Sequence, residues 1–160
     1  MSVQACVCAA PKRLAQQVGA ADSCAIIVAG GSGTRFGNPL GGLCGLPLVA
    51  WSLIAFDRAP SVAQLVLVIE GGREEEVREH VLSRVSLATP VVLATAGETR
   101  QESVFSGLRA MDERLALVAV HDGARPLIDA QTIEGCISCV RDDASLAGAI
   151  CALPSIDTLK

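Results

Sequence analysis

The sequence CAIIVAGGSGTRFG, from Cys24 to Gly37, joins a short aliphatic run to a glycine-rich turn. A continuous aliphatic run is typical of a strand that is covered on both faces, as in a parallel sheet. Glycines allow the backbone to turn with positive φ and to approach a ligand closely, and the N–H groups of such a turn can hold phosphate oxygens. The segment therefore predicts a buried strand with an anion-binding loop at its carboxyl end.

The rest of the chain repeats this alternation of aliphatic runs and amphipathic stretches. Thr99 and Glu102 have the spacing of a capping box, and Asp129 is typical of a helix N-cap. The pattern predicts a three-layer, Rossmann-like α/β domain with a mostly parallel sheet. The further aliphatic runs cover residues 65–69, 91–94, 115–120 and 147–153, and the helical patterns cover residues 48–58, 73–85, 104–111 and 129–141.

The composition excludes several kinds of partner. The chain has 160 residues and a net charge of −4, with three Phe, one Trp and no Tyr. It offers neither long-range attraction nor stacking surfaces to nucleic acid. No apolar run reaches the roughly 20 residues needed to cross a membrane, so we expect no membrane partner. We expect residues 1–22 to be a flexible leader and residues 23–160 to form the domain.

Cysteine is abundant, and two of the cysteines have the C-x-x-C spacing of metal and redox sites, Cys136 and Cys139. A zinc site needs further ligands, and the chain has only two histidines. The pair also falls inside a predicted helix rather than at its start, where thiolates are activated. We expect buried, reduced cysteines in a cytoplasmic protein. The seven cysteines are Cys6, Cys8, Cys24, Cys44, Cys136, Cys139 and Cys151.

The glycine-rich turn differs from two common phosphate-binding motifs. Its glycines are spaced one residue too long for the dinucleotide fingerprint, and no Lys follows them as in a P-loop. The segment AGGSGTRF, residues 29–36, resembles the signature of nucleotidyltransferases that use nucleoside triphosphates. The resemblance implies nucleotide contacts at Ala29, Gly30, Gly31 and Gly33. Arg35 would be the catalytic residue, because a fixed guanidinium can offset the charge that develops around the α-phosphorus.

A second segment points to one family among the nucleotidyltransferases. Residues 97–108, GETRQESVFSGL, resemble a segment of the 2-C-methyl-D-erythritol 4-phosphate cytidylyltransferases that helps to recognise cytidine. The resemblance implies nucleotide contacts at Gly97, Glu98 and Ser103. A capped helix alone would account for Thr99 and Glu102 but not for the joint match.

Two further segments resemble the same family. Residues 121–126, HDGARP, place Asp122 and Arg125 beyond a predicted strand, where the resemblance implies contacts with substrate phosphate. Asp122 also suits Mg²⁺, and we expect His121 to position or pack rather than to act as a base. The alternative is a structural Asp–Arg pair in a turn. Residues 157–160, DTLK, resemble a motif in which Thr158 would help to hold the sugar phosphate.

Taken in order, these segments resemble one family across residues 25–160. The resemblance implies a nucleotidyltransferase domain that uses CTP and Mg²⁺ to convert a sugar-alcohol phosphate, 2-C-methyl-D-erythritol 4-phosphate, into a CDP-sugar alcohol and pyrophosphate. This reaction belongs to isoprenoid precursor synthesis by the non-mevalonate route, and relatives are homodimers. A ribitol 5-phosphate cytidylyltransferase and a non-catalytic remnant that binds nucleotide or a partner are the alternatives.

The chain departs from the family in two places. The family has Pro-Lys-Gln after the glycine turn, whereas Pro39 is followed here by Leu40, Gly41 and Gly42. Family members also continue beyond the DTLK motif, so we expect the C-terminal part of the fold to be missing.

Overall fold

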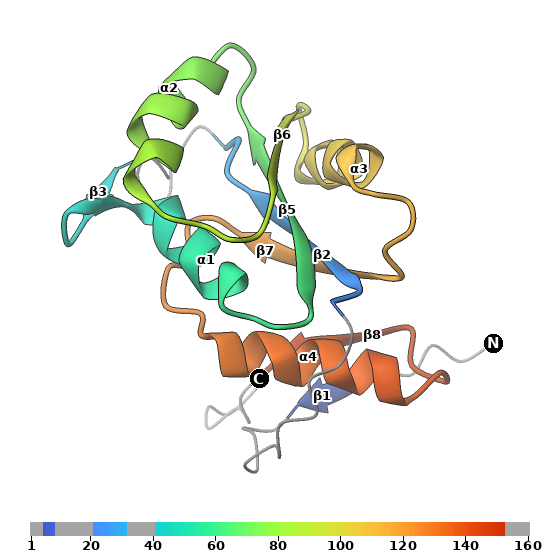
Figure 1. Cartoon of the computed structure of the whole chain (residues 1–160). Helices are drawn as coiled ribbons and strands as arrows, with labels where there is room; N and C mark the ends of the chain where they lie inside the picture. Colours follow the sequence, from blue (N-terminus) through green and yellow to red (C-terminus); the bar gives the residue numbers. More distant parts are fainter. Residues whose placement is uncertain (1–4, 9–20, 32–40, 153–160) are drawn as a thin grey trace, which may run out of the picture.

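The central element is a four-stranded parallel sheet with the strand order β6-β5-β2-β7 (Figure 1). The computed structural model describes residues 21–31 and 41–152, together with the backbone of residues 5–8. The parallel pairing confirms the predicted α/β class. The strands of this sheet are β2 (Ser23–Val28), β5 (Val62–Ile69), β6 (Val91–Thr95) and β7 (Leu117–Asp122).

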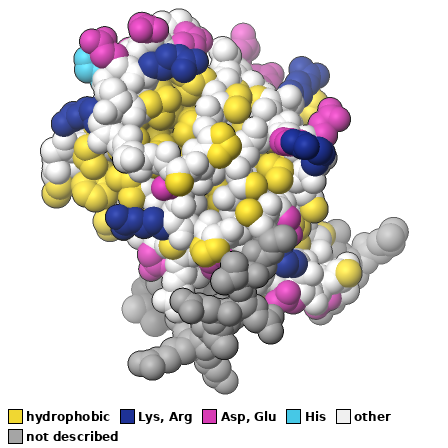
Figure 2. Space-filling view, in the orientation of Figure 1, with side chains coloured by type: hydrophobic (Ala, Val, Ile, Leu, Met, Phe, Trp, Pro, Cys, Tyr) yellow, Lys and Arg dark blue, Asp and Glu magenta, His cyan; other side chains and the backbone are white. Residues whose placement is uncertain are grey.

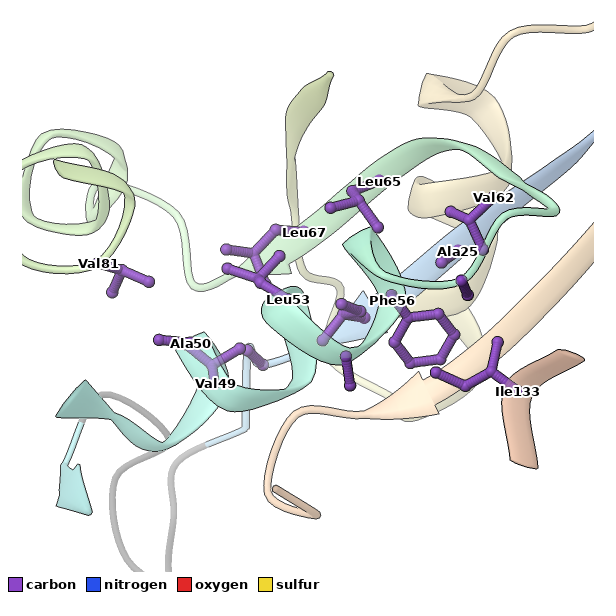
Figure 3. Close-up of a cluster of buried hydrophobic side chains, with 14 of the residues drawn as sticks. Ala25, Val49, Ala50, Leu53, Phe56, Val62, Leu65, Leu67, Val81 and Ile133 are labelled. Atoms are coloured by element: carbon purple, nitrogen blue, oxygen red, sulfur yellow. The ribbon is translucent and has the colours of Figure 1, made fainter. Parts of the chain in front are cut away.

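Helices cover both faces of the sheet and complete the three predicted layers. Residues of α1, α2 and α4 form one hydrophobic cluster with Ala25, Ile27 and Leu67 of the sheet (Figure 3). Ile26 and Val66 face the opposite side, where α3 packs. The alternation along β2 therefore divides the core into two clusters, one on each side of the sheet. The helices are α1 (Leu48–Asp57), α2 (Glu74–His80), α3 (Arg100–Ala110) and α4 (Ala130–Asp142).

The predicted helix caps are confirmed. At the start of α3, the amide of Glu102 donates to Thr99 Oγ1 at 3.1 Å, and the amide of Thr99 donates to Glu102 Oε2 at 3.0 Å. At the start of α4, the amide of Thr132 donates to Asp129 Oδ1 at 2.7 Å, which lowers the pKa of that carboxyl group. Each cap satisfies amides that have no partner inside the helix.

One predicted helix is shorter than its pattern. Residues 73–85 were expected to form a single helix, but α2 ends at His80 and a 3₁₀ turn, η1 (Leu82–Arg84), follows. Three valines of this pattern share one face; Val77 and Val81 are buried, and Val85 is half-buried. Charged side chains gather over α2 (Figure 2), and its acidic first turn suits the positive end of the helix dipole.

A short hairpin that the sequence did not predict precedes α1. It consists of β3 (Gly42–Leu43) and β4 (Leu46–Pro47), and both residues of its turn have positive φ, 48° at Cys44 and 84° at Gly45. Positive φ at both central residues is typical of a type I′ turn. The indole N–H of Trp51 donates to Leu43 O at 3.0 Å and fixes the hairpin against α1.

The fifth predicted strand lies outside the central sheet. Strand β8 (Gly148–Cys151) pairs instead with β1 (Ala5–Cys8), in parallel, alongside α4 (Figure 1). The sequence predicted a strand here correctly but did not specify its partner, because an aliphatic run does not encode which strand it pairs with. Strand β1 also falls within residues 1–22, which were expected to be a flexible leader, and Asp22 forms an ion pair with Arg141.

The prediction that the cysteines are buried is wrong for most of the described thiols. Cys24 is buried, whereas Cys136 and Cys139 are half-buried and Cys44 and Cys151 are exposed. The C-x-x-C pair does lie inside a helix, as predicted. Among the described residues, no helix has both the length and the apolar character needed to cross a membrane.

We expect two helical glycines to respond oppositely to substitution by Ala. A Cβ on Gly107 of α3 would lie 2.5 Å from Ile26 Cγ2, so Gly107→Ala should lower the free energy of unfolding by about 1–3 kcal/mol. A Cβ on Gly135 of α4 would meet no atom within 4 Å in the described part of the chain. Gly135→Ala should therefore raise the free energy of unfolding by up to about 1 kcal/mol through helix propensity. Urea denaturation of both variants measures this; stabilisation by Gly107→Ala would contradict the packing described.

Candidate functional site

Three loops meet at the carboxyl edge of the central sheet, following β2, β6 and β7 (Figure 1). Each loop begins with a backbone hydrogen bond to the neighbouring strand. The amide of Ala29 donates to Val68 O at 2.7 Å, that of Ala96 to Ile69 O at 2.7 Å, and that of Gly123 to Val28 O at 2.9 Å. In parallel sheets this edge is where ligands bind.

The first loop packs directly against the loop that follows β6. A Cβ on Gly30 would lie 2.2 Å from Ala96 Cβ, so only glycine allows the two loops to approach this closely. Ala29 is buried beside Gly30, and Gly31 is exposed. The structure thus brings together the described part of the predicted glycine turn and the predicted cytidine segment. Gly33 and Arg35 lie outside the described residues, as does Thr158.

Ser103 holds the second loop in shape. Its hydroxyl accepts the amide of Gly97 at 3.1 Å and donates to Thr99 O at 2.9 Å, and the residue is 4% exposed. A Cβ on Gly97 would lie 2.3 Å from Glu102 Cβ, so glycine is required here too. Ser103 is therefore buried beneath the loop, whereas Glu98 lies on its exposed side.

Asp122 joins the second and third loops through two arginines. Arg100 Nη2 lies 2.8 Å from Asp122 Oδ1, and Arg125 Nε lies 3.3 Å from Asp122 Oδ2. Both guanidinium groups are largely exposed, with side-chain exposures of 62% and 78%. Exposed ion pairs contribute little stability, so these groups can exchange partners readily. Arg100 was absent from the predicted site, although it is the Arg of the GETR segment; the signal that could have found it was its position in that motif.

His121 supports the third loop from below. Its Nε2 lies 3.1 Å from Arg125 O and 3.2 Å from Ser52 Oγ, and its ring centroid lies 5.2 Å from that of Phe56. Burial lowers the pKa of His121, which favours the neutral imidazole. Because a carbonyl oxygen only accepts, a neutral ring that bonds Arg125 O carries its proton on Nε2. These contacts fit the predicted positioning and packing role of His121.

An open groove of about 1010 Å³ extends from these loops along β7 toward α4 and β8. Arg100, Asp122 and Arg125 line its polar end. Its apolar wall includes side chains that are unusually exposed for large aliphatic residues, with Val118 at 39%, Val120 at 44% and Ile150 at 59%. The groove offers two cations and a carboxylate at one end and apolar contacts along its length.

The described residues provide a limited set of metal ligands. They contain no group of three or more His, Cys, Asp or Glu side chains that could hold a metal ion. Asp122 is a single carboxylate with 35% side-chain exposure. Mg²⁺ is often bound by one or two carboxylates, with waters and substrate phosphates completing the coordination. Asp122 fits a site of that kind rather than a cage built by the protein alone.

The parallel sheet, with a glycine-rich first loop and polar loops at the same edge, is shared with solved cytidylyltransferases of nucleotidyltransferase fold. The solved structure of 4-diphosphocytidyl-2C-methyl-D-erythritol synthase from Anaerococcus prevotii matches it with a TM-score of 0.65 and 27% sequence identity. The match covers 76% of this chain and 51% of that one.

Sequence comparison identifies the family within this class. Residues 23–160 match the family described as IspD, 2-C-methyl-D-erythritol 4-phosphate cytidylyltransferase, and the chain belongs to this family. It is 35% identical over 139 residues to the 2-C-methyl-D-erythritol 4-phosphate cytidylyltransferase of Synechococcus elongatus, covering 84% of this chain and 58% of that protein. It is 36% identical over 144 residues to the bifunctional enzyme IspD/IspF of Desulforudis audaxviator, covering 88% of this chain and 36% of that protein. The match therefore spans 58% of the length of the first of these relatives and 36% of the length of the second.

The lowered pKa of His121 predicts a loss of stability in mild acid. Below about pH 6.5 the imidazole of the unfolded chain takes up a proton before the buried one does. The free energy of unfolding should therefore fall as the pH drops from about 6.5 toward the folded pKa, and His121→Gln should remove that part of the fall. Chemical denaturation between about pH 7.5 and 5 measures the effect.

His80→Gln is measured in parallel as a substitution control, because His80 is the other histidine of the chain and is exposed on α2. The same pH dependence in His121→Gln as in the unchanged protein would show that burial does not perturb His121.

Proposed function

We propose that this chain forms the nucleotide-binding part of a CTP-dependent cytidylyltransferase that acts on 2-C-methyl-D-erythritol 4-phosphate. The products would be the CDP-sugar alcohol and pyrophosphate, in isoprenoid precursor synthesis, and the reaction would take place in the cytoplasm. The family match supports the substrate pair. The observation that carries the proposal is the convergence of three loops at one sheet edge, through the contact of Gly30 with Ala96 and the bridge from Arg100 to Asp122.

The glycine turn and the cytidine segment would hold CTP. The amides of Ala29 and Gly97 already donate to Val68 O and Ser103 Oγ. Contact with the nucleotide is therefore assigned to Gly30 and Gly31, which follow Ala29 in the first loop, to Gly33, and to the exposed Glu98. Ala29, Gly97 and Ser103 would act by fixing the shape of the two loops.

Transfer requires attack by an oxygen of the acceptor phosphate on the α-phosphorus of CTP. A new P–O bond forms, the bond between the α- and β-phosphates breaks, and pyrophosphate leaves with the electron pair. The acceptor is already an ionised phosphate monoester, so no strong base is needed. Arg35 would offset the charge at the α-phosphate, and Arg125, with Arg100 beside it, would bind phosphate oxygens as bidentate donors.

Asp122 would exchange its two arginines for a different partner when substrates bind. Released from Asp122, the guanidinium groups of Arg100 and Arg125 could turn toward phosphate without crossing buried surface, since both are exposed. Asp122 would then hold Mg²⁺, which supplies positive charge to the triphosphate. This exchange needs only weak surface ion pairs to break.

We expect Asp122→Asn to lower pyrophosphate release by about 100-fold or more, because the variant loses the charge that holds both arginines and the cation. The assay mixes CTP, Mg²⁺ and 2-C-methyl-D-erythritol 4-phosphate and measures pyrophosphate by coupled hydrolysis. Asp112→Asn is the matched control: Asp112 also pairs with an exposed arginine, Arg114 at 2.6 Å, but lies before the amino end of β7.

Full activity in Asp122→Asn would contradict the assigned role of this carboxylate. Absence of pyrophosphate release from the folded, unchanged chain would contradict transfer by this chain and favour a non-catalytic nucleotide-binding role. Replacement of the acceptor by ribitol 5-phosphate tests the choice of acceptor in the same assay.

A further inference from the structure

Two thiols from different elements meet beside the groove. Cys136 lies on α4 and Cys151 lies at the end of β8, 15 residues later, and their sulfur atoms are 3.2 Å apart. The helix and the strand run side by side (Figure 1), which is what brings the two side chains together. Both residues line the groove between β7, α4 and β8.

This pair is more accessible than the buried thiol of the central sheet. Cys151 is exposed and Cys136 is half-buried, so a small oxidant can reach the first sulfur from solvent. Cys24, by contrast, is fully buried in β2, and burial raises the pKa of its thiol to about 11. Thiolate character and access together decide which cysteines react. Cys44 is exposed but lies on the β3–β4 hairpin, away from the pair.

We propose that Cys136 and Cys151 are a redox modification site, which forms an intramolecular disulfide on reaction with a low-molecular-weight disulfide such as oxidised glutathione. The thiolate of Cys151 attacks one sulfur of the small disulfide, which forms a mixed disulfide and releases one small thiol. The thiolate of Cys136 then attacks the Cys151 sulfur and releases the second small thiol. The protein loses two protons and two electrons, and the small disulfide gains both as two thiols.

The new bond would tie the last described strand to the domain. Strand β8 is held by its pairing with β1 and by packing against α4, and two of its residues, Ile150 and Cys151, are exposed. A covalent link to α4 would fix β8 in place, and with it one wall of the groove. It would also restrict the unfolded chain over the loop from Cys136 to Cys151, which stabilises the folded state.

The test oxidises the full chain with oxidised glutathione under native conditions, alkylates the remaining thiols, and determines the mass. We expect the mass to fall by about 2 Da before alkylation and two fewer thiols to be alkylated than in the reduced chain, both reversed by dithiothreitol, and the Tm to rise by about 5–10 °C. A non-reducing tryptic digest should contain the peptide that ends at Arg141 linked to the peptide that starts at Asp142.

Matched variants locate the bond. Cys136→Ser and Cys151→Ser should each abolish the cross-link, whereas Cys139→Ser, one turn further along α4, should keep it. Cys8→Ser should also keep it, although Cys8 is opposite Cys151 in the register of β1 and β8. Loss of the cross-link in Cys8→Ser or Cys139→Ser, or retention of both thiols at Cys136 and Cys151 in the oxidised chain, would overturn the proposal. Fragmentation of the linked peptides from the unchanged protein distinguishes Cys136 from Cys139, which share the peptide that ends at Arg141, even if a variant fails to fold.

Discussion

Strand β2 carries hydrogen bonds on both edges and is buried on both faces, and the rest of the structure depends on this position. Ala25 and Ile27 contribute to the core under α1, α2 and α4, whereas Ile26 contributes to the core under α3. Residues 23–27 of this strand are buried, so they present no side chain to a ligand. The residues that can contact a ligand therefore come only after the strand ends, from Ala29 and Gly30 onward.

Close approach of backbones at that edge explains why glycines and exposed charges occur together there. Gly30 and Gly97 have no room for a Cβ, so the loops that carry them lie tightly against their neighbours. The charged residues Arg100, Asp122 and Arg125 then stand at the rim, where water keeps their mutual attraction weak. Closely packed loops with exchangeable charges at their rim would suit the proposed binding and cleavage of a triphosphate.

The sequence predicted the features that depend on local pattern. The strands of the central sheet, the capping box at Thr99 and the Asp129 cap all follow from residues that are close in the chain. It did not predict the pairing of β8 with β1, since aliphatic runs do not encode their partners. It also missed the bridge from Arg100 to Asp122, because those residues are 22 positions apart and meet only through the parallel sheet.

The central claim is that CTP binds at the carboxyl edge of the sheet, where the loops after β2, β6 and β7 meet. Titration of the ¹⁵N-labelled chain with CTP and Mg²⁺, followed through amide chemical shifts, tests this most directly. We predict that the largest shifts occur at Gly30, Gly31, Glu98 and Gly123, while Gly135 of α4 stays unchanged. Shifts concentrated on α2 or at the amino ends of the strands, or no shifts at all in the folded chain, would contradict the account.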